Sequence, residues 1–160
     1  MTTDTASFEL HRSLPLAPAR LWRVLTDPVE RAAWNAPAAG MTATVEVADL
    51  RVGGFERHHY TSGGTIEDMP DFTAETRWYH LASPTRAVFT ETVVIEGELQ
   101  FTSLVTYVLR PAAAGADLTV SVATSSFTGP EMLDGLSQGW EGGLANLEAH
   151  ISKLAQGAPR

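Results

Sequence analysis

The sequence contains no cysteine among its 160 residues. Disulfide bridges, thiolate metal ligands and cysteine nucleophiles are therefore excluded. Basic residues are also scarce: Lys153 is the single lysine among 11 basic residues, against 19 acidic residues and a formal net charge of −8. Because binding to nucleic acid phosphates or to an anionic membrane surface needs clustered Lys and Arg, we expect neither partner.

The chain also lacks any apolar run long enough to span a bilayer. Its polar start, MTTDTAS, has no apolar stretch typical of a secretory signal, so we expect a cytoplasmic location. No glycine-rich loop has the order that cradles phosphates, and no cofactor is expected. Hydrophobic residues make up 44% and charged residues 19%, which together with the length indicates one folded domain.

Short alternating segments with turn residues between them predict a meander of about seven strands. The expected strands cover residues 8–14, 40–52, 55–61, 72–82, 87–95, 99–111 and 116–127. Gly53-Gly54 is expected to form the hairpin turn between the second and third strands. Residues 62–71, SGGTIEDMPD, give the longest loop signal in the chain.

Two short helices are expected after the first strand. Pro18 suits the first turn of one helix, and Asp27 suits the N-cap of the next, with Pro28 at its first helical position. A curved antiparallel sheet that wraps around one long helix hides the single apolar face of each, so the pattern predicts an α+β fold.

The long helix is predicted at the end of the chain. Apolar residues recur at steps of three and four from Leu133 to Leu154, and Gly157 ends the helix. Gly139, Gly142 and Gly143 are unusual inside a helix, because each costs roughly 1 kcal/mol relative to Ala. Either the sheet or a ligand passes close to these glycines, or the helix is locally weak.

Several segments resemble a known family in the family's own order, from Phe8 to Leu154. They are FELHRSLPLAPARLWRVLTDPVERAAW, DLRVGG, WYHLASPTRAVFT, SLVTYVL, FTGPEMLDG and GWEGGLANLEAHI. The chain resembles the SRPBCC (START/Bet v 1-like) superfamily, and more closely its AHSA1-like branch, similar to the C-terminal domain of the Hsp90 ATPase activator.

The resemblance implies a helix-grip (Bet v 1-like) fold, with about seven curved antiparallel strands and two short helices wrapped around the C-terminal helix. It implies a single domain over residues 8–155, with flexible ends at 1–7 and 156–160. It also implies a deep cavity between the sheet and the helix. Family members bind apolar or aromatic small molecules; some are polyketide cyclases or aromatases, and some are co-chaperone modules.

The stretch DLRVGGFERHHY supplies the main candidate site. Alternation along the strand places Glu56, His58 and Tyr60 on one face, and the resemblance implies that this face points into the cavity. Desolvation would raise the pKa of Glu56 and a protonated His58 would lower it, so the two groups could share a proton near neutral pH. Tyr60 could then donate to an oxyanion. Alternatively, the three groups contact a ligand without chemistry, satisfy one another, or form a solvated rim.

Further candidate ligand contacts are aromatic or apolar. Trp78 and Tyr79 adjoin on a strand, so one of them faces inward. Trp140 is the largest residue on the apolar stripe of the long helix and either forms the cavity floor or packs in the core. Leu136 and Leu144 lie on the same stripe.

No metal site is expected. The rings of His58 and His59 point to opposite faces of a strand and cannot chelate one ion together. His80 and Glu56 could join His58, but no spacing typical of metal ligands appears.

Three functions compete. The first is binding of a small apolar or aromatic molecule in the cavity. The second is a cyclase, aromatase or dehydratase activity that uses Glu56, His58 and Tyr60. The third is a co-chaperone-like interaction module, for which an exposed apolar patch on the outer face of the sheet would be expected. The sequence shows no such patch clearly, and it leaves homodimer formation open.

Overall fold

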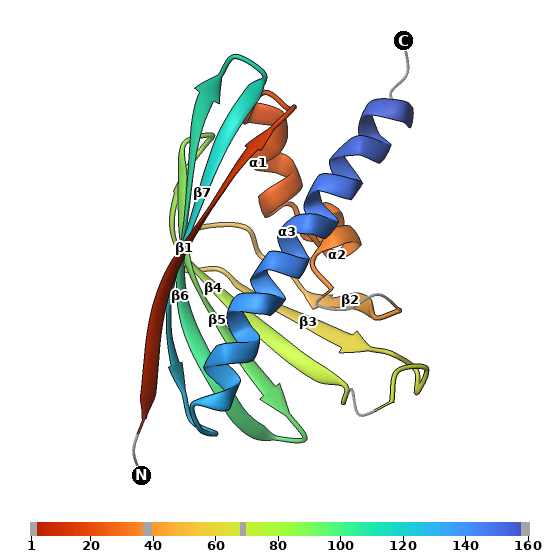
Figure 1. Cartoon of the computed structure of the whole chain (residues 1–160), viewed down its shortest axis with the longest axis vertical. Coiled ribbons are helices and arrows are strands. Elements are labelled where there is room, and N and C mark those ends of the chain that lie inside the picture. Colours follow the sequence, from red (N-terminus) through yellow and green to blue (C-terminus); the bar gives the residue numbers. More distant parts are fainter. Residues whose placement is uncertain (1–2, 37–39, 68–69, 158–160) are drawn as a thin grey trace.

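The computed structural model describes residues 3–36, 40–67 and 70–157. Its elements are β1 (Asp4–Leu14), α1 (Pro18–Thr26), α2 (Pro28–Trp34), β2 (Thr42–Val47), β3 (Phe55–Thr61), β4 (Phe72–Ala82), β5 (Arg86–Ile95), β6 (Glu98–Ala112), β7 (Gly115–Ser126) and α3 (Glu131–Gly157). The seven strands form one antiparallel sheet in the order β1-β7-β6-β5-β4-β3-β2. Figure 1 shows the curved sheet with α3 running obliquely across it and α1 and α2 beside α3. This is the predicted α+β helix-grip fold.

The helix signals in the sequence act as predicted. Asp27 caps α2, because its side chain accepts hydrogen bonds from the backbone N–H groups of Val29 and Glu30 at 3.0 Å. This cap fixes the start of α2 and therefore the position of Arg31 one turn later. Among the described residues, none of the helices combines the length and the apolar character that crossing a membrane would require.

The first strand begins earlier than predicted. Residues 4–7, expected to be flexible, belong to β1 and pair with Ala123–Ser126 of β7. At the other end, α3 continues to Gly157. Residues 1–2 and 158–160 of the expected flexible ends lie outside the described residues.

The glycine pair lies in the turn before β3, but the connection is longer than a two-residue hairpin loop. β2 ends at Val47, and the connection to β3 closes with a turn in which Gly54 N–H donates to Arg51 O at 2.8 Å and Gly53 has a φ of 81°. The two glycines also pair with β4, which was not predicted. Gly53 N–H donates to Trp78 O at 2.7 Å, and Trp78 N–H donates to Gly54 O at 3.1 Å. A Cβ on Gly54 would lie 1.9 Å from Asp49 O, so the tight fold of the preceding loop requires glycine there.

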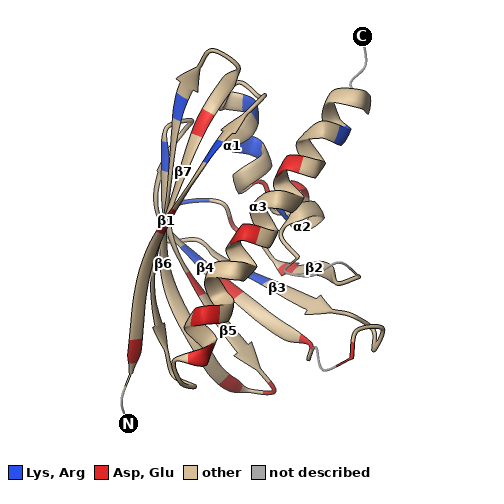
Figure 2. Ribbon diagram, viewed as in Figure 1, with Lys and Arg blue, Asp and Glu red and all other residues tan. Residues whose placement is uncertain are grey.

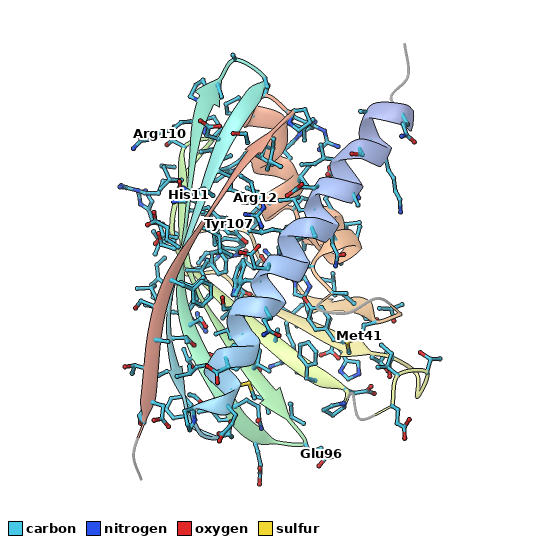
Figure 3. All side chains as sticks on the ribbon, viewed as in Figure 1. His11, Arg12, Met41, Glu96, Tyr107 and Arg110 are labelled. Carbon is cyan, nitrogen blue, oxygen red and sulfur yellow. The ribbon has the colours of Figure 1, made fainter. Side chains whose placement is uncertain are left out.

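Two apolar clusters occupy the concave side of the sheet. The larger one joins α1 and the second half of α3 to strands β4 to β7, and it includes Trp78, Phe89 and Leu147. Tyr107 belongs to it and lies between the sheet and α3, as Figure 3 shows. The smaller cluster, around Tyr60, lies nearer the start of α3. The space between this second cluster and α3 holds the site described next.

Candidate ligand-binding cavity

A cavity of about 350 Å³ lies between the first half of α3 and strands β3 to β6. Its wall consists of Asn35, Tyr60, Pro70, Phe72, Ala74, Glu91, Val93, Ile95, Phe101, Met132, Gly135, Leu136, Gly139, Trp140 and Gly143. Four of these side chains carry polar groups: Asn35, Tyr60, Glu91 and, through its indole N–H, Trp140. The site is therefore a largely apolar chamber with few hydrogen-bonding points, as is typical of small-molecule sites.

Three glycines of α3 open the cavity on its helical side. Gly135, Gly139 and Gly143 follow at steps of four, which places them on one face of the helix. A Cβ built on any of them would meet no atom within 4 Å. The sheet therefore does not press against these glycines; their missing side chains leave the space that the cavity occupies. Gly142, the other glycine of this segment, is not in the wall.

Three of the seven predicted contact residues line this cavity: Tyr60, Leu136 and Trp140. The other four are fully buried in the core outside the wall, and they are Glu56, His58, Trp78 and Leu144. Glu56, His58 and Tyr60 do point inward together, as predicted. Of the two adjoining aromatics, Trp78 faces inward and Tyr79 is 55% exposed on the outer face.

Glu56 is held in a buried hydrogen-bonded network. Arg31 Nη2 donates to Glu56 Oε1 at 2.5 Å, and Trp78 Nε1 donates to Glu56 Oε2 at 2.5 Å. His58 Nε2 lies 3.1 Å from Glu56 Oε1 and 3.0 Å from Arg31 Nη2. The guanidinium of Arg31 also stacks over the Trp78 ring at 5.3 Å from its centre. Both oxygens of the Glu56 carboxylate are therefore occupied within the protein.

This network corrects the sequence-based expectation for Glu56. Burial by itself would raise the pKa of Glu56, but the hydrogen bond from His58, the charge of Arg31 and the hydrogen bond from Trp78 outweigh it and hold the pKa below its usual value. Glu56 is therefore a carboxylate at neutral pH, and its pKa is not raised as proton sharing near neutral pH would require. The prediction missed Arg31, which lies 25 residues before Glu56 and reaches it only through the packing of α2.

A polar row crosses the inner face of the sheet between the two apolar clusters. The residues are direct neighbours on adjacent strands: Glu56, Thr76, Glu91, Ser103 and Thr124. On one side of this row lies the apolar row that contains Trp78 and Phe89, and on the other the row that contains Ala74 and Val93. Ser103 and Thr124 are paired by a hydrogen bond of 2.8 Å. The polar row thus marks the boundary between the packed core and the cavity.

Glu91 is the member of this row that faces the cavity. It forms no hydrogen bond or ion pair with any residue that the structure describes, although Arg31 and His58 lie close enough to act on it electrostatically. The side chain is partly accessible from the cavity, yet burial raises its pKa more than Arg31 and His58 lower it.

Sequence reasoning missed Glu91, but a signal was present. The inward positions of β5 are Ala87, Phe89, Glu91 and Val93, so Glu91 interrupts an otherwise apolar set. A charged residue at an inward position of a strand is rare unless it is paired or functional.

Asn35 and Tyr60 form the second polar point of the wall. Asn35 ends α2 as its C-cap, and its Nδ2 donates to the Tyr60 hydroxyl oxygen at 3.2 Å. The Tyr60 ring stacks on Phe72 with 4.6 Å between ring centres. Burial raises the pKa of Tyr60 well above its usual value, so the residue is a neutral phenol. Among the described residues, no three His, Asp or Glu side chains are grouped so as to hold a metal ion.

Comparison with known proteins gives the same fold. No curated protein sequence matches the chain significantly. The crystal structure of the Mll3558 protein from Rhizobium loti is 25% identical, has a TM-score of 0.80, and covers 94% of this chain and 99% of its own. The crystal structure of protein CV1439 from Chromobacterium violaceum is 26% identical and has a TM-score of 0.77. The match covers 91% of this chain and 96% of that protein's chain.

A third similar structure shows the fold alone. The solution structure of the AHSA1-like protein from Aeromonas hydrophila is 20% identical, with a TM-score of 0.72 and coverage of 97% of this chain and 98% of its own. Residues 15–152 match the family described as Activator of Hsp90 ATPase homolog 1-like protein. Since this match spans most of the sequence, the chain belongs to the Activator of Hsp90 ATPase homolog 1-like family, within the SRPBCC superfamily.

Proposed function

We propose that this protein binds a small apolar or aromatic molecule in the cavity between α3 and the sheet. The observation that carries the proposal is the row Gly135, Gly139 and Gly143, which leaves open space in a helix that would be more stable with alanine at each position. A helix that gives up stability to keep a cavity open is best explained by an occupant of that cavity. The stacked Tyr60 and Phe72 and the Trp140 ring supply flat apolar walls for an aromatic ligand.

The gain from burial is sufficient for useful affinity. A bicyclic aromatic ligand that buries about 200 Å² of apolar surface would gain about 5 kcal/mol from the hydrophobic effect. Part of this gain is lost to the restricted motion of the bound ligand. Micromolar affinity therefore needs one or two specific polar contacts in addition, which Glu91, Tyr60 and Asn35 can supply.

The acid–base alternative draws less support. Glu56 and His58, the two groups that it requires for proton transfer, do not line the cavity, and a general base must reach the proton that it removes. The co-chaperone-like alternative stays a prediction of the sequence.

The proposal is tested by filling the cavity. Gly139→Leu places a side chain in the open space, whereas Ala149→Leu adds the same group on the exposed face of α3. We expect naphthalen-2-ylmethanol to bind the wild type and Ala149→Leu equally in isothermal titration calorimetry, and not to bind Gly139→Leu. Native mass spectrometry of freshly purified protein should show an additional mass that is lost on denaturation and absent from Gly139→Leu. Equal occupancy of wild type and Gly139→Leu would contradict the proposal.

A further inference from the structure

The charged residues around the cavity restrict which class of ligand it can bind. With the exception of Asn35, the whole wall comes from segments 58–76, 87–109 and 111–152, and none of these segments contains a lysine or an arginine. Figure 2 shows acidic positions at the start of α3 and around the β5–β6 turn, with the basic positions elsewhere. The described part of the wall therefore offers no cationic side chain to an anionic ligand.

Exposed acidic residues adjoin the lining residues in the sequence. Four exposed carboxylates are sequence neighbours of lining residues, and they are Asp71, Glu96, Glu131 and Asp134. Figure 3 shows Glu96 at the end of the molecule where the β5–β6 turn lies. Exposed carboxylates attract cations and repel anions within about one Debye length, roughly 8 Å at physiological ionic strength.

Inside the cavity, Glu91 forms no hydrogen bond or ion pair with the residues that the structure describes. The charged and titratable groups that act on it are Arg31 from α2 and His58 from β3, while Tyr60 and Tyr107 lie near enough for Glu91 to affect their own pKa values. Arg31 is paired with Glu56 through Nη2, and it forms no ion pair with Glu91. The face of α3 toward the cavity contributes no titratable side chain. An ionised Glu91 would therefore feel Arg31 and His58 only at a distance, and it would have no hydrogen-bond donor among the described residues.

We propose that the ligand of this cavity is an apolar or aromatic molecule with one positively charged amine, and that the Glu91 carboxylate binds the ammonium group. The inference rests on the proposed ligand-binding function and names the chemical class of the ligand. An ammonium group satisfies the unpartnered carboxylate with a charge-assisted hydrogen bond. The aromatic rings of Tyr60, Phe72 and Trp140 in the same wall are suited both to an apolar body and to a cation.

Binding of an amine is then coupled to a proton. Burial raises the pKa of Glu91 in the empty cavity, and a bound ammonium group lowers it again. Below the pKa of the empty protein, Glu91 must release its proton to solvent when the ligand binds. Affinity for an amine therefore increases as pH rises through that pKa and becomes constant above it, provided that the amine stays protonated.

Three probes of one shape test the inference. They are naphthalen-2-ylmethylamine, which is cationic at neutral pH, naphthalen-2-ylmethanol, which is neutral, and 2-naphthoate, which is anionic. Their affinities are measured by titration calorimetry for the wild type, for Glu91→Gln, and for Glu75→Gln. Glu75→Gln is the matched control, because Glu75 lies on the neighbouring strand, pairs with Arg57 and does not line the cavity.

We expect the amine to bind the wild type at least roughly tenfold more tightly than the alcohol. A charged hydrogen bond in a desolvated site contributes enough binding free energy for a difference of this size. The preference should persist in Glu75→Gln and disappear in Glu91→Gln, where the alcohol still binds. The naphthoate should bind most weakly. The preference should also survive a rise in salt concentration, because a buried pair is screened little.

The outcomes separate the two proposals. If the alcohol binds but the amine shows no preference, or if the preference remains in Glu91→Gln, the assignment of Glu91 and the amine is wrong while ligand binding stands. If none of the three probes binds the wild type, both proposals are overturned. An amine affinity that falls as pH rises from 5 to 8 would also overturn the role of Glu91.

Discussion

Replacement of Arg31 by methionine tests the buried network around Glu56. The side chains of Arg31 and Glu56 are 5% and 0% exposed and are paired at 2.5 Å. Arg31→Met removes the cation and leaves the Glu56 carboxylate with only Trp78 and His58 as partners. Removing one partner of a buried ion pair costs about 3–5 kcal/mol. The free energy of unfolding of a natural domain is about 5–15 kcal/mol in total, so the variant should fold but be much less stable.

Arg20→Met is the matched control. Arg20 pairs with Glu30 at 2.7 Å, but both side chains are about a third exposed, at 31% and 29%. Partly exposed pairs contribute at most about 1 kcal/mol. Urea unfolding followed by tryptophan fluorescence measures both variants. The free energy of unfolding falls by about 2 kcal/mol per M of urea. Arg31→Met should therefore lower the urea concentration at the unfolding midpoint by about 2 M, and Arg20→Met by less than about 0.5 M.

The effect of Arg31→Met depends on pH with a definite sign. The pKa of Glu56 is lowered below 4.5 in the folded protein, so its interactions contribute stability above pH 4.5 that is lost as pH falls through the folded pKa. Arg31→Met removes the positive charge that lowers the pKa of Glu56, while burial still raises that pKa. The stability lost in this variant is therefore largest at neutral pH, where Glu56 is ionised, and smaller in acid. Adding Glu56→Gln to Arg31→Met should restore part of the stability at pH 7. The reasoning fails if Arg31→Met at pH 7 costs no more than Arg20→Met.

Three further predictions concern the glycines and Glu91. The triple variant with alanine at positions 135, 139 and 143 should be more stable by about 2–3 kcal/mol in urea, because each added methyl group meets no atom and favours the helix; a loss of stability would mean that the cavity is filled by the protein itself. Glu91→Gln should gain stability over the wild type as pH rises above 4.5, because the wild type loses stability from 4.5 up to the raised pKa of Glu91. Thermal unfolding of both proteins from pH 4 to 8 measures the stability difference, and a difference that does not change with pH would contradict the prediction. Gly54→Ala should cost about 3 kcal/mol, since its Cβ would lie 1.9 Å from Asp49 O; Gly135→Ala, where the added methyl group has free space, is the control, and equal midpoints for the two would refute the close contact.

Much of the fold followed from local patterns in the sequence. The alternation of Phe55–Thr61 set which side chains share a face, because side chains of a strand alternate regardless of what packs against them. Asp27 and Pro28 placed the start of α2 for an equally local reason, the hydrogen bonds of the first helical turn. The steps of three and four after Leu133 likewise predicted the long helix.

The sequence predicted the pairing of strands and turns less well where it depends on backbone that is distant in the chain. The Gly53-Gly54 pair lies in a turn, as its composition indicates, but its pairing with Trp78 on β4 was not predicted, because it depends on the sheet continuing past the end of β2. Residues 4–7 appear too polar for a core strand, but they lie on an edge strand that pairs with β7, and edge strands tolerate polar residues.

The tertiary structure alone decided the chemistry of the candidate site. Whether an inward carboxylate is a pocket group or a structural one depends on what reaches it from other elements, and spacing along one strand does not contain that information. Arg31 of α2 reaches Glu56 and makes it a structural anion outside the cavity wall. Glu91, on the same polar row, receives no such partner among the described residues and faces the cavity that the glycines of α3 leave open. The sequence determined which side chains share one face of a strand. Three-dimensional packing determined which inward carboxylate gained a paired cation, because the pairing energy of a buried charge depends on distances between segments far apart in the chain.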